Sequence, residues 1–155
     1  MQDPLKIIQV CSIDDEAIDT EAMGDSLAEY AKTHDPHLLR FKSEKRPVVF
    51  MIGNMTPGYI AGAISTARGE LSALRAVLAC VHEVQLSDGE TLTPEKLEKG
   101  DFEQKVATPS WLQRLREYVD YDRIVEIGIV ATDLAKLSEK KRRPFELSVG
   151  LGAKG

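Results

Sequence analysis

Three histidines, His34, His37 and His82, are the side chains best suited to bind a metal ion or transfer a proton. His34 and His37 have the spacing of a metal pair in a loop, but the sequence fixes no third ligand. Asp-Pro lies between them and predicts a turn, so we interpret both as turn histidines. His82 follows a long apolar-periodic segment, where a cation suits the C-terminal end of a helix dipole. Helix capping is its expected role.

The two cysteines, Cys11 and Cys80, lie far apart and outside any Cys-x-x-C pair. Neither has an adjacent histidine or belongs to a nucleophile motif. We therefore expect two free buried thiols, which suits a reducing cytoplasm. An enzyme that uses Cys80 or His82 in a cleft is kept as a third hypothesis.

Carboxylates occur in two short groups, residues 14–16 and the pair Asp120 and Asp122. Solvated helix starts explain both groups. Residues 53–58 join a predicted strand to a predicted helix, where free N–H groups can hold a phosphate, but they lack the lysine and glycine spacing of a P-loop. The sequence therefore predicts no catalytic residue, no cofactor and no metal site, and we expect a protein that is not an enzyme.

Length and composition restrict the class of protein further. The chain has 155 residues, of which 43% are hydrophobic and 29% charged, with a formal net charge of -5. These values favour one globular domain over disorder, and the acidic balance argues against strong nucleic-acid binding. No segment approaches the roughly 18 uninterrupted apolar residues of a membrane span, and no signal peptide is recognisable at residues 1–6.

The first third of the chain predicts a strand, a helix and a hairpin. Residues 5–10 are rich in β-branched side chains and predict a strand. Residues 14–32 have amphipathic spacing with acids in the first turn, although Gly24 weakens the pattern. Two apolar runs, residues 38–41 and 47–52, flank a charged bend and predict a β-hairpin.

The strongest periodic signal predicts one helix over residues 57–82, with Thr56 as its N-cap and a potential break at Gly69. Its apolar residues alternate in steps of four and three, as in a heptad repeat. This stripe faces either the protein's own core or a second helix of a partner. The candidate partner-binding residues on it are Ile60, Ile64, Leu71, Leu74 and Leu78.

The second half predicts a hairpin tip and three helices. Asp88-Gly89 between apolar residues predicts the hairpin tip. Thr-Pro pairs predict the starts of helices over residues 93–100 and 109–119, and a further amphipathic run predicts a helix over residues 121–137. The resulting fold class is α+β and mostly helical: a small antiparallel hairpin or sheet, joined by residues 5–10, beside four or five helices.

The end of the chain differs in composition. We expect Pro144 to stop any helix, so that residues 1–143 form the globular domain and residues 144–155 an extended or flexible tail able to pair with another chain. A basic patch precedes the proline and comprises Lys140, Lys141, Arg142 and Arg143. Further candidate partner-binding residues in the tail are Phe145, Leu147, Val149 and Leu151.

The order of segments from residue 48 onward resembles bacteriophage tail assembly chaperones and related small tail-morphogenesis proteins. The resemblance covers about two thirds of the chain and consists of Met55-Thr56-Pro57 before an Ala/Leu-rich helix, an Asp88-Gly89-Glu90 turn, a helix near Trp111-Leu112, and a final helix ending Leu-Ala-Lys-Leu-Ser-Glu at residues 134–139.

That resemblance implies a non-catalytic protein that binds a tape-measure protein or recruits tube subunits in the host cytoplasm. Its implied partners are tape-measure, tube or connector subunits, with a homo-oligomer as a further expectation. The first alternative is a resident structural subunit of the virion head, connector or tail. The second is a small adaptor that binds a host factor through the acidic residues 14–16.

Overall fold

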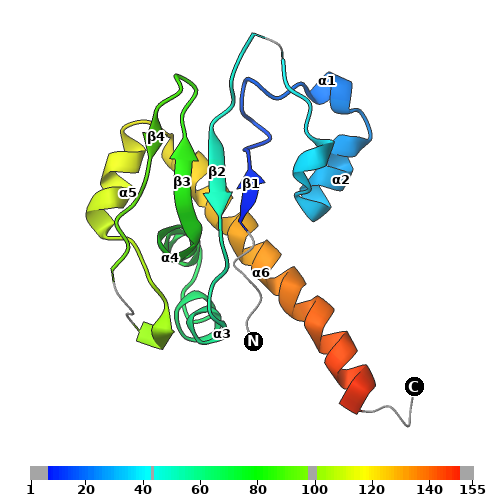
Figure 1. The fold of residues 1–155 in the computed structure, drawn as a ribbon, viewed down its shortest axis with the longest axis vertical. Helices are drawn as coiled ribbons and strands as arrows, with labels where there is room; N and C mark the ends of the chain where they lie inside the picture. Colours follow the sequence, from blue (N-terminus) through cyan, green and yellow to red (C-terminus); the bar gives the residue numbers. More distant parts are fainter. Residues whose placement is uncertain (1–6, 43, 98–100, 151–155) are drawn as a thin grey trace.

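The computed structural model describes residues 7–42, 44–97 and 101–150; for residue 101 and residues 137–150 it describes the backbone only. Within these ranges, a four-stranded antiparallel sheet has the order β1-β2-β3-β4 (Figure 1). The strands are β1 (Ile8–Val10), β2 (Val49–Ile52), β3 (Val81–Gln85) and β4 (Thr91–Leu92).

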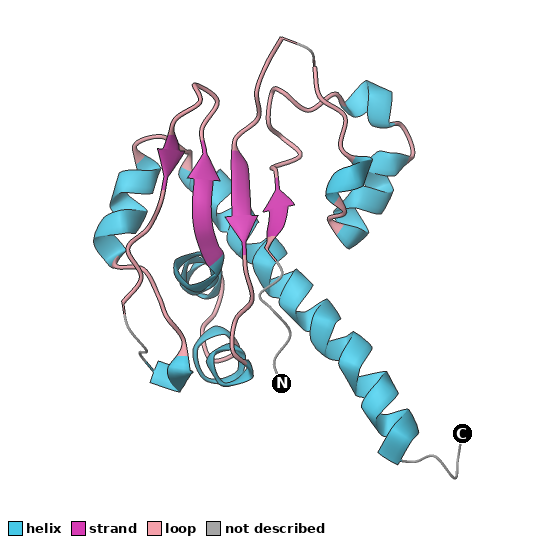
Figure 2. Cartoon of the chain, viewed as in Figure 1, coloured by secondary structure: helices cyan, strands magenta, loops and turns pink. Residues whose placement is uncertain are grey.

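The described residues also form six α-helices. They are α1 (Thr20–Met23), α2 (Ser26–Thr33), α3 (Pro57–Tyr59), α4 (Glu70–Cys80), α5 (Pro109–Arg116) and α6 (Tyr121–Gly150). Two 3-10 turns, Pro36–Leu38 and Asp101–Glu103, and a π-helical turn, Ile60–Ile64, complete the elements. The predicted α+β class with an antiparallel sheet is confirmed (Figure 2). No helix of the described residues is long and apolar enough to cross a membrane.

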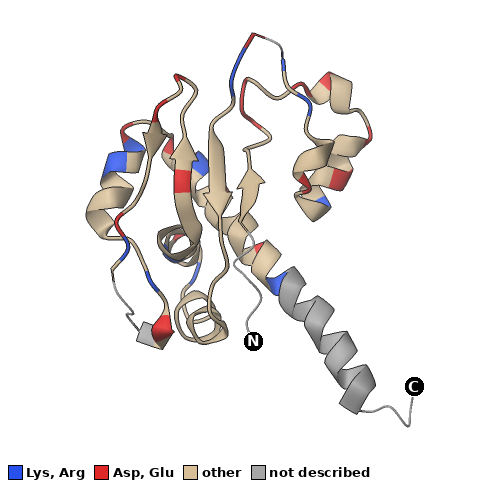
Figure 3. Cartoon of the chain, in the orientation of Figure 1, with Lys and Arg blue, Asp and Glu red and all other residues tan. Residues whose placement is uncertain are grey.

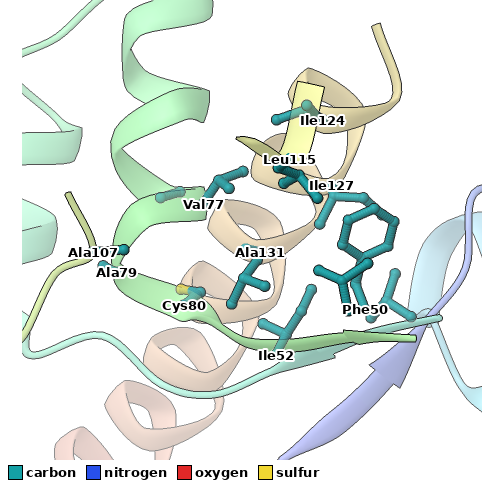
Figure 4. Packing of buried hydrophobic residues seen from close by; sticks show 14 of the residues in the cluster. Phe50, Ile52, Val77, Ala79, Cys80, Ala107, Leu115, Ile124, Ile127 and Ala131 are labelled. Carbon is teal, nitrogen blue, oxygen red and sulfur yellow. The ribbon is translucent and has the colours of Figure 1, made fainter. Parts of the chain in front are cut away.

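The main hydrophobic core lies between one face of the sheet and helices α4, α5 and α6 (Figure 4). Alternate residues of β2 are buried, so Phe50 and Ile52 point toward the helices. Val77 of α4, Leu115 of α5 and Ile127 of α6 meet them there, each essentially without solvent exposure. On the opposite face of the sheet, Val49 packs against a second cluster, and Met51 belongs to neither cluster.

A second, smaller cluster packs α1 and α2 beside the first strand. Tyr30 of α2 is its largest buried side chain. The Tyr30 hydroxyl donates to the carbonyl of Cys11 at 3.2 Å and accepts from the Cys11 N–H at 3.4 Å. This side chain therefore satisfies the backbone just beyond β1, where the sheet has no further strand among the described residues.

Helices α4 and α6 cross at very short range because α6 has Gly128 at the crossing. A Cβ atom added to Gly128 would lie 2.6 Å from the carbonyl carbon and 2.8 Å from the Cα of Ala73, and closer still to its carbonyl oxygen. The absence of a side chain at Gly128 therefore sets the distance between the two longest packed helices.

The hairpin predicted from residues 38–41 and 47–52 is wrong. Strand β2 pairs with β1 and β3, while Phe41 forms an isolated bridge with Ile18. Pro36 starts a 3-10 turn, and the Arg40 carbonyl then accepts from the N–H of Asp19. The apolar run at residues 47–52 does contain strand β2, but the pairing of a strand with its partners is a tertiary effect that local patterns do not encode.

The predicted single helix over residues 57–82 is also wrong. Gly69 adopts φ +58, so the break expected there is confirmed, and α4 begins one residue later. At the other end the chain leaves the helix at Val81 and enters β3, as its β-branched residues favour. The heptad-like residues therefore belong to three elements and do not share one face.

Two other helix predictions need correction. The helix predicted over residues 14–32 begins only at Thr20, so the acidic residues 14–16 do not start a helix, and it is divided into α1 and α2 because Gly24 between them takes φ +53. Residues 93–97 are not helical: Leu97 donates its N–H to Val106, and Lys96 bridges Ala107, so this segment is extended. Residues 98–100 lie outside the described part of the chain.

Helix α6 begins at Tyr121 as predicted, but it continues beyond the predicted end at residue 137 and through Pro144 to Gly150. A proline inside a helix removes one i→i−4 hydrogen bond, which costs about 3 kcal/mol but does not forbid the helix when its neighbours favour it. The extended conformation expected for residues 144–150 is therefore wrong, and residues 151–155 lie outside the described part.

Candidate functional site

Both thiols are buried and free, as expected. Burial raises the pKa of Cys11 to about 12, and the nearby Asp15 carboxylate adds to the shift. Burial likewise raises the pKa of Cys80 to about 12, although Lys96 opposes it. A nucleophilic cysteine needs a lowered pKa and access to its substrate. These two side chains therefore act as small apolar core residues.

Lys96 caps the C-terminus of α4. Its Nζ atom donates to the carbonyl oxygens of Leu78 at 2.9 Å and Ala79 at 3.0 Å, two of the carbonyls that a helix end leaves free. Burial lowers the pKa of Lys96 to about 8, against the smaller opposing effect of the Cys80 thiol. The expected helix-capping cation is therefore this lysine.

His82 does not cap a helix, contrary to the prediction, because it lies in β3. The register between β2 and β3 shifts beside it, and its ring rests on Gly53, where a Cβ would lie 2.6 Å from the His82 Cδ2. Burial lowers the pKa of His82, and Lys96 lowers it further. His34 ends α2 with φ +53 and meets the Tyr30 ring edge-on, consistent with a turn histidine.

The structure brings together the two carboxylate groups noted in the sequence. A pocket of about 400 Å³ lies where the loop after β1 meets the start of α6. Within this contact Asp15 is buried and accepts the N–H groups of Ala17 and Val48, each at 2.9 Å, so its role is structural. The pocket is lined by Asp14, Asp120, Tyr121, Asp122, Arg123 and Glu126.

The lining of this acidic pocket is better suited to bind a cationic group than to catalyse a reaction. Arg123 occupies part of it and lies 3.9 Å from Asp15, so one positive charge is already present. Ser12 donates to Glu126 at 2.7 Å and fixes the loop to α6. No set of three His, Cys, Asp or Glu side chains among the described residues is placed to hold a metal ion.

One face of the sheet is only partly covered in the described part of the chain: Val49 on this face packs against the α1–α2 cluster, whereas Met51 belongs to neither core cluster. Met51 lies at its centre and is half-buried, between Gln9 on one side and Glu83 on the other. Gln85 and Thr91 extend the same face and are exposed. Among the residues of the four strands, Glu83 of β3 is the one Asp, Glu, Lys or Arg, and Figure 3 shows a red segment on β3. We call Gln9, Met51, Glu83, Gln85 and Thr91 the open sheet face.

A second exposed feature is a loop that we call the strap, residues 102–104. Phe102 and Glu103 both have left-handed backbones, with φ +61 and +58, which costs non-glycine residues about 1–2 kcal/mol each. Thr56 holds the strap: its hydroxyl donates to the Phe102 carbonyl at 2.9 Å, and its N–H donates to the Gln104 side chain at 2.8 Å.

The Phe102 ring lies over two glycines of the neighbouring helical segment. A Cβ at Gly62 would lie 2.8 Å from Cε2 of the ring and nearer to two other ring atoms, and one at Gly58 would lie 3.4 Å from the Phe102 Cβ. The ring is nevertheless 47% exposed. We call the two glycines under this ring, Gly58 and Gly62, the glycine notch.

The candidate partner-binding residues predicted from the heptad spacing do not form one surface. Ile64 is in the core, and Ile60, Leu74 and Leu78 pack against the core. Leu71 alone of the five is largely exposed, at 51%. The side chains of the basic patch and of the tail candidates, residues 140–143 and Phe145, Leu147, Val149 and Leu151, lie outside the described side chains.

Sequence reasoning missed both the open sheet face and the glycine notch. Residues 48–52 are all apolar, so no alternation distinguished Met51 from its buried neighbours. Phe102 stands between charged residues in a segment without periodicity. Comparison with protein-family models, curated proteins and solved structures finds no match. The function is therefore argued from the chain's own residues.

Proposed function

We propose that this protein is a non-catalytic, protein-binding component of bacteriophage assembly that acts on other tail proteins, as a tail assembly chaperone does. The open sheet face carries this proposal. It is a nearly uncharged surface with a methionine at its centre, and methionine adapts its unbranched side chain to partners of different shape. A protein that engages aggregation-prone partners for a short time benefits from such a surface.

The roles of the reactive side chains support a binding function. The two thiols belong to the core, and Lys96 closes a helix end. His82 packs on Gly53. Each of these groups has a structural task at its position, so the chemistry that they could perform is not needed to explain them.

The phage setting rests on the order of segments described for the sequence, from Met55-Thr56-Pro57 to the end of the final helix. Two forms of the proposal differ in the fate of the protein. An assembly chaperone leaves before the particle is finished. A resident head, connector or tail subunit stays in it.

The test is affinity capture of the tagged full chain from the cells that naturally make it, followed by mass spectrometry. We expect to recover a tape-measure or tube protein in near-stoichiometric amount. The tagged chain itself should be absent from finished particles if it is an assembly chaperone and present in them if it is a resident subunit. Met51→Lys places a charge on the open sheet face and is expected to reduce that recovery at least tenfold. Gln113→Lys, on the exposed side of α5, is the matched control.

Leu71→Lys separates the open sheet face from the predicted heptad surface, since Leu71 is the exposed member of that set. Loss of the partner with Leu71→Lys but not with Met51→Lys would move the binding surface to α4. Recovery of no stoichiometric partner by the unmodified chain would refute the proposed function.

A second candidate, the host-factor adaptor, is favoured by the acidic pocket. The pocket joins Asp14 of the N-terminal acidic stretch to Asp120 and Asp122, and so concentrates negative charge on one site. The variant with Asp14→Asn and Asp122→Asn should then weaken capture of a basic partner, with a strong dependence on salt. Unchanged capture at low and high salt would exclude this candidate.

A further inference from the structure

Residues 12–42, which we call the N-terminal unit, form a body that is closed on itself. Figure 1 shows its helices α1 and α2 beside the sheet at the β1 edge. The N–H of Lys42 donates to the Ala17 carbonyl at 2.8 Å, which joins the end of the unit to its start. The N–H of Asp19 donates to the Arg40 carbonyl at the same distance. The second hydrophobic cluster lies mainly within the unit and shares no buried residue with the main core. The unit can therefore move without losing its own structure.

Polar side chains hold the start of the unit against the rest of the protein, and we call these contacts the latch. Ser12 donates to Glu126 of α6 at 2.7 Å. Asp15 accepts the N–H of Val48, just before β2, at 2.9 Å. Arg123 of α6 lies 3.9 Å from the Asp15 carboxylate. Each of these contacts exchanges water for a protein partner, so its net contribution to stability is small.

Further polar contacts of the unit are open to water. Lys45 pairs with Glu16 at 3.1 Å, and both side chains are more than half exposed. Arg123 donates to the Asp14 carbonyl at 3.2 Å, also at the surface. Exposed contacts of this kind stabilise a structure little because water and salt compete for the same groups.

The apolar contact of the unit with the sheet involves two residues that lie outside the unit. Val49 of β2 is half-buried and packs against the second cluster. Cys11 directly follows β1, belongs to that cluster and is only 4% exposed. Tyr30 of the unit hydrogen-bonds both backbone groups of Cys11. Lifting the unit therefore uncovers Val49 and Cys11 and leaves the main core intact.

We propose that the N-terminal unit is a lid that opens as one body when the latch breaks, and that it uncovers Val49 beside Met51. These two residues alternate with the buried Phe50 and Ile52 on β2, so they point to the same side of the sheet. In the open state they form one apolar strip, which enlarges the open sheet face. Proteins draw their lids from parts that have few buried apolar contacts with the rest of the fold, because such parts open without global unfolding.

This inference rests on the proposed function only for the use of the enlarged face by a partner protein. Opening of the lid is measured on the purified full chain with no partner present. The capture experiment with Met51→Lys and the lid experiment can therefore fail independently of each other.

The two buried thiols report on opening from within one chain. Cys11 lies under the lid and Cys80 lies in the main core. Burial raises the pKa of each thiol to about 12, so both are protected from alkylation in the closed state. The folded chain is incubated with iodoacetamide without denaturant, and modification of each cysteine is followed by mass spectrometry. We expect Cys11 to react at least about tenfold faster than Cys80, since Cys80 is uncovered only when the main core opens.

Hydrogen exchange determines whether the lid opens as one body. The Val48 N–H donates to the latch, so it should exchange with the same opening equilibrium that Cys11 modification reports. The N–H groups of Asp19 and Lys42 donate within the unit and should exchange at least about tenfold more slowly than that of Val48.

Arg123→Gln removes the positive charge beside Asp15 and weakens the latch. We expect the ratio of Cys11 to Cys80 modification to rise several-fold in this variant. Arg114→Gln is the matched control, because it removes the same charge from an exposed position of α5 and should leave the ratio unchanged.

Equal modification rates of Cys11 and Cys80 in the unmodified chain would overturn the inference, because the unit would then open only with the whole domain. Exchange of Asp19 and Lys42 as fast as that of Val48 would also overturn it, since the unit would unfold and not lift. An unchanged ratio in folded Arg123→Gln would show that the latch does not hold the lid closed. If that variant does not fold, the thiol and exchange results on the unmodified chain still decide.

Discussion

Gly128→Ala tests whether the crossing of α4 and α6 is set by backbone contact. An added Cβ would lie 2.6 Å from the carbonyl carbon of Ala73, where ordinary contacts begin near 3.4 Å, so the helices must separate by nearly 1 Å. Overpacking of a well-packed core costs about 1–3 kcal/mol. The substitution also removes the helix penalty of glycine, a gain of about 0.8–1 kcal/mol.

Because the added Cβ meets backbone atoms, which yield least, the overpacking cost lies in the upper half of that range, about 2–3 kcal/mol, and the difference predicts a net loss of about 1–2 kcal/mol in the free energy of unfolding. For a chain of this length each kcal/mol lowers Tm by roughly 2–4 °C, so a fall of about 2–8 °C is expected in a thermal melt. Ile129→Ala, at the next and exposed position of α6, is the control and should change stability by less than about 0.5 kcal/mol.

The reasoning is refuted if Gly128→Ala is as stable as the unmodified chain or more stable, because only the helix-propensity gain would then be felt. Shortening Ala73 to glycine offers a second check. The colliding atoms belong to the Ala73 backbone, so Gly128→Ala with Ala73→Gly should not recover the lost stability. Recovery would show that the methyl group of Ala73 was the obstacle.

Three further outcomes follow from single side chains. Tyr30→Phe removes the hydroxyl that satisfies both backbone groups of Cys11, and urea unfolding should show a loss of about 1–3 kcal/mol, whereas an unchanged midpoint would mean that water replaces it. In Asp15→Asn, a single carboxamide oxygen replaces the two carboxylate oxygens that accept the N–H groups of Ala17 and Val48. The free energy of unfolding at pH 7 should fall by a similar amount. Lys96 has its pKa lowered by burial from 10.5 to about 8, so between these values the unfolded chain binds more protons and stability rises with pH. We therefore compare the free energy of unfolding of the unmodified chain with that of Lys96→Met. The difference between the two should increase above pH 8, by at most about 1.4 kcal/mol per pH unit. A difference that stays constant between about pH 7 and 9.5 would contradict the burial of the amine. Taking the difference cancels the opposite trend from the buried thiols, whose raised pKa values lower stability above pH 9.

Features fixed by neighbouring residues could be predicted from the sequence. The Asp88-Gly89 turn joins β3 to β4, with Gly89 at φ +94 and the Asp88 carboxylate accepting the N–H of Glu90 at 2.9 Å. Thr56 caps α3 by accepting the N–H of Tyr59 at 3.2 Å, and the Thr108-Pro109 pair starts α5. Turn and cap chemistry acts within four residues, so a local pattern contains all of its causes.

Features that depend on distant partners could not be predicted. Strand β2 pairs with β1 and β3 and not with the apolar run at residues 38–41, and this pairing depends on which residues cover the inner face of the sheet. The heptad spacing misled for a related reason. Between Ile60 and Val81 the backbone passes from a π-turn through a left-handed glycine to a strand, so equal spacing in sequence does not mean a common face in space.

From the sequence, the glycines of the helical segments were used only as evidence against a helix, but their positions also indicate where another part of the chain approaches closely. Glycine in a helix costs about 0.8–1 kcal/mol relative to alanine, so a helix that retains it is expected to use the missing side chain. At Gly128 the use is the close approach of α4, and at Gly62 it is the seat of the Phe102 ring. Gly24 and Gly69, in contrast, have nothing within 4 Å of an added Cβ and serve the left-handed backbone instead. The glycines in and beside the helices therefore divide into those that turn the chain, Gly24 and Gly69, and those that admit a neighbour, Gly62 and Gly128, and the crossing of α4 and α6 depends on the second kind.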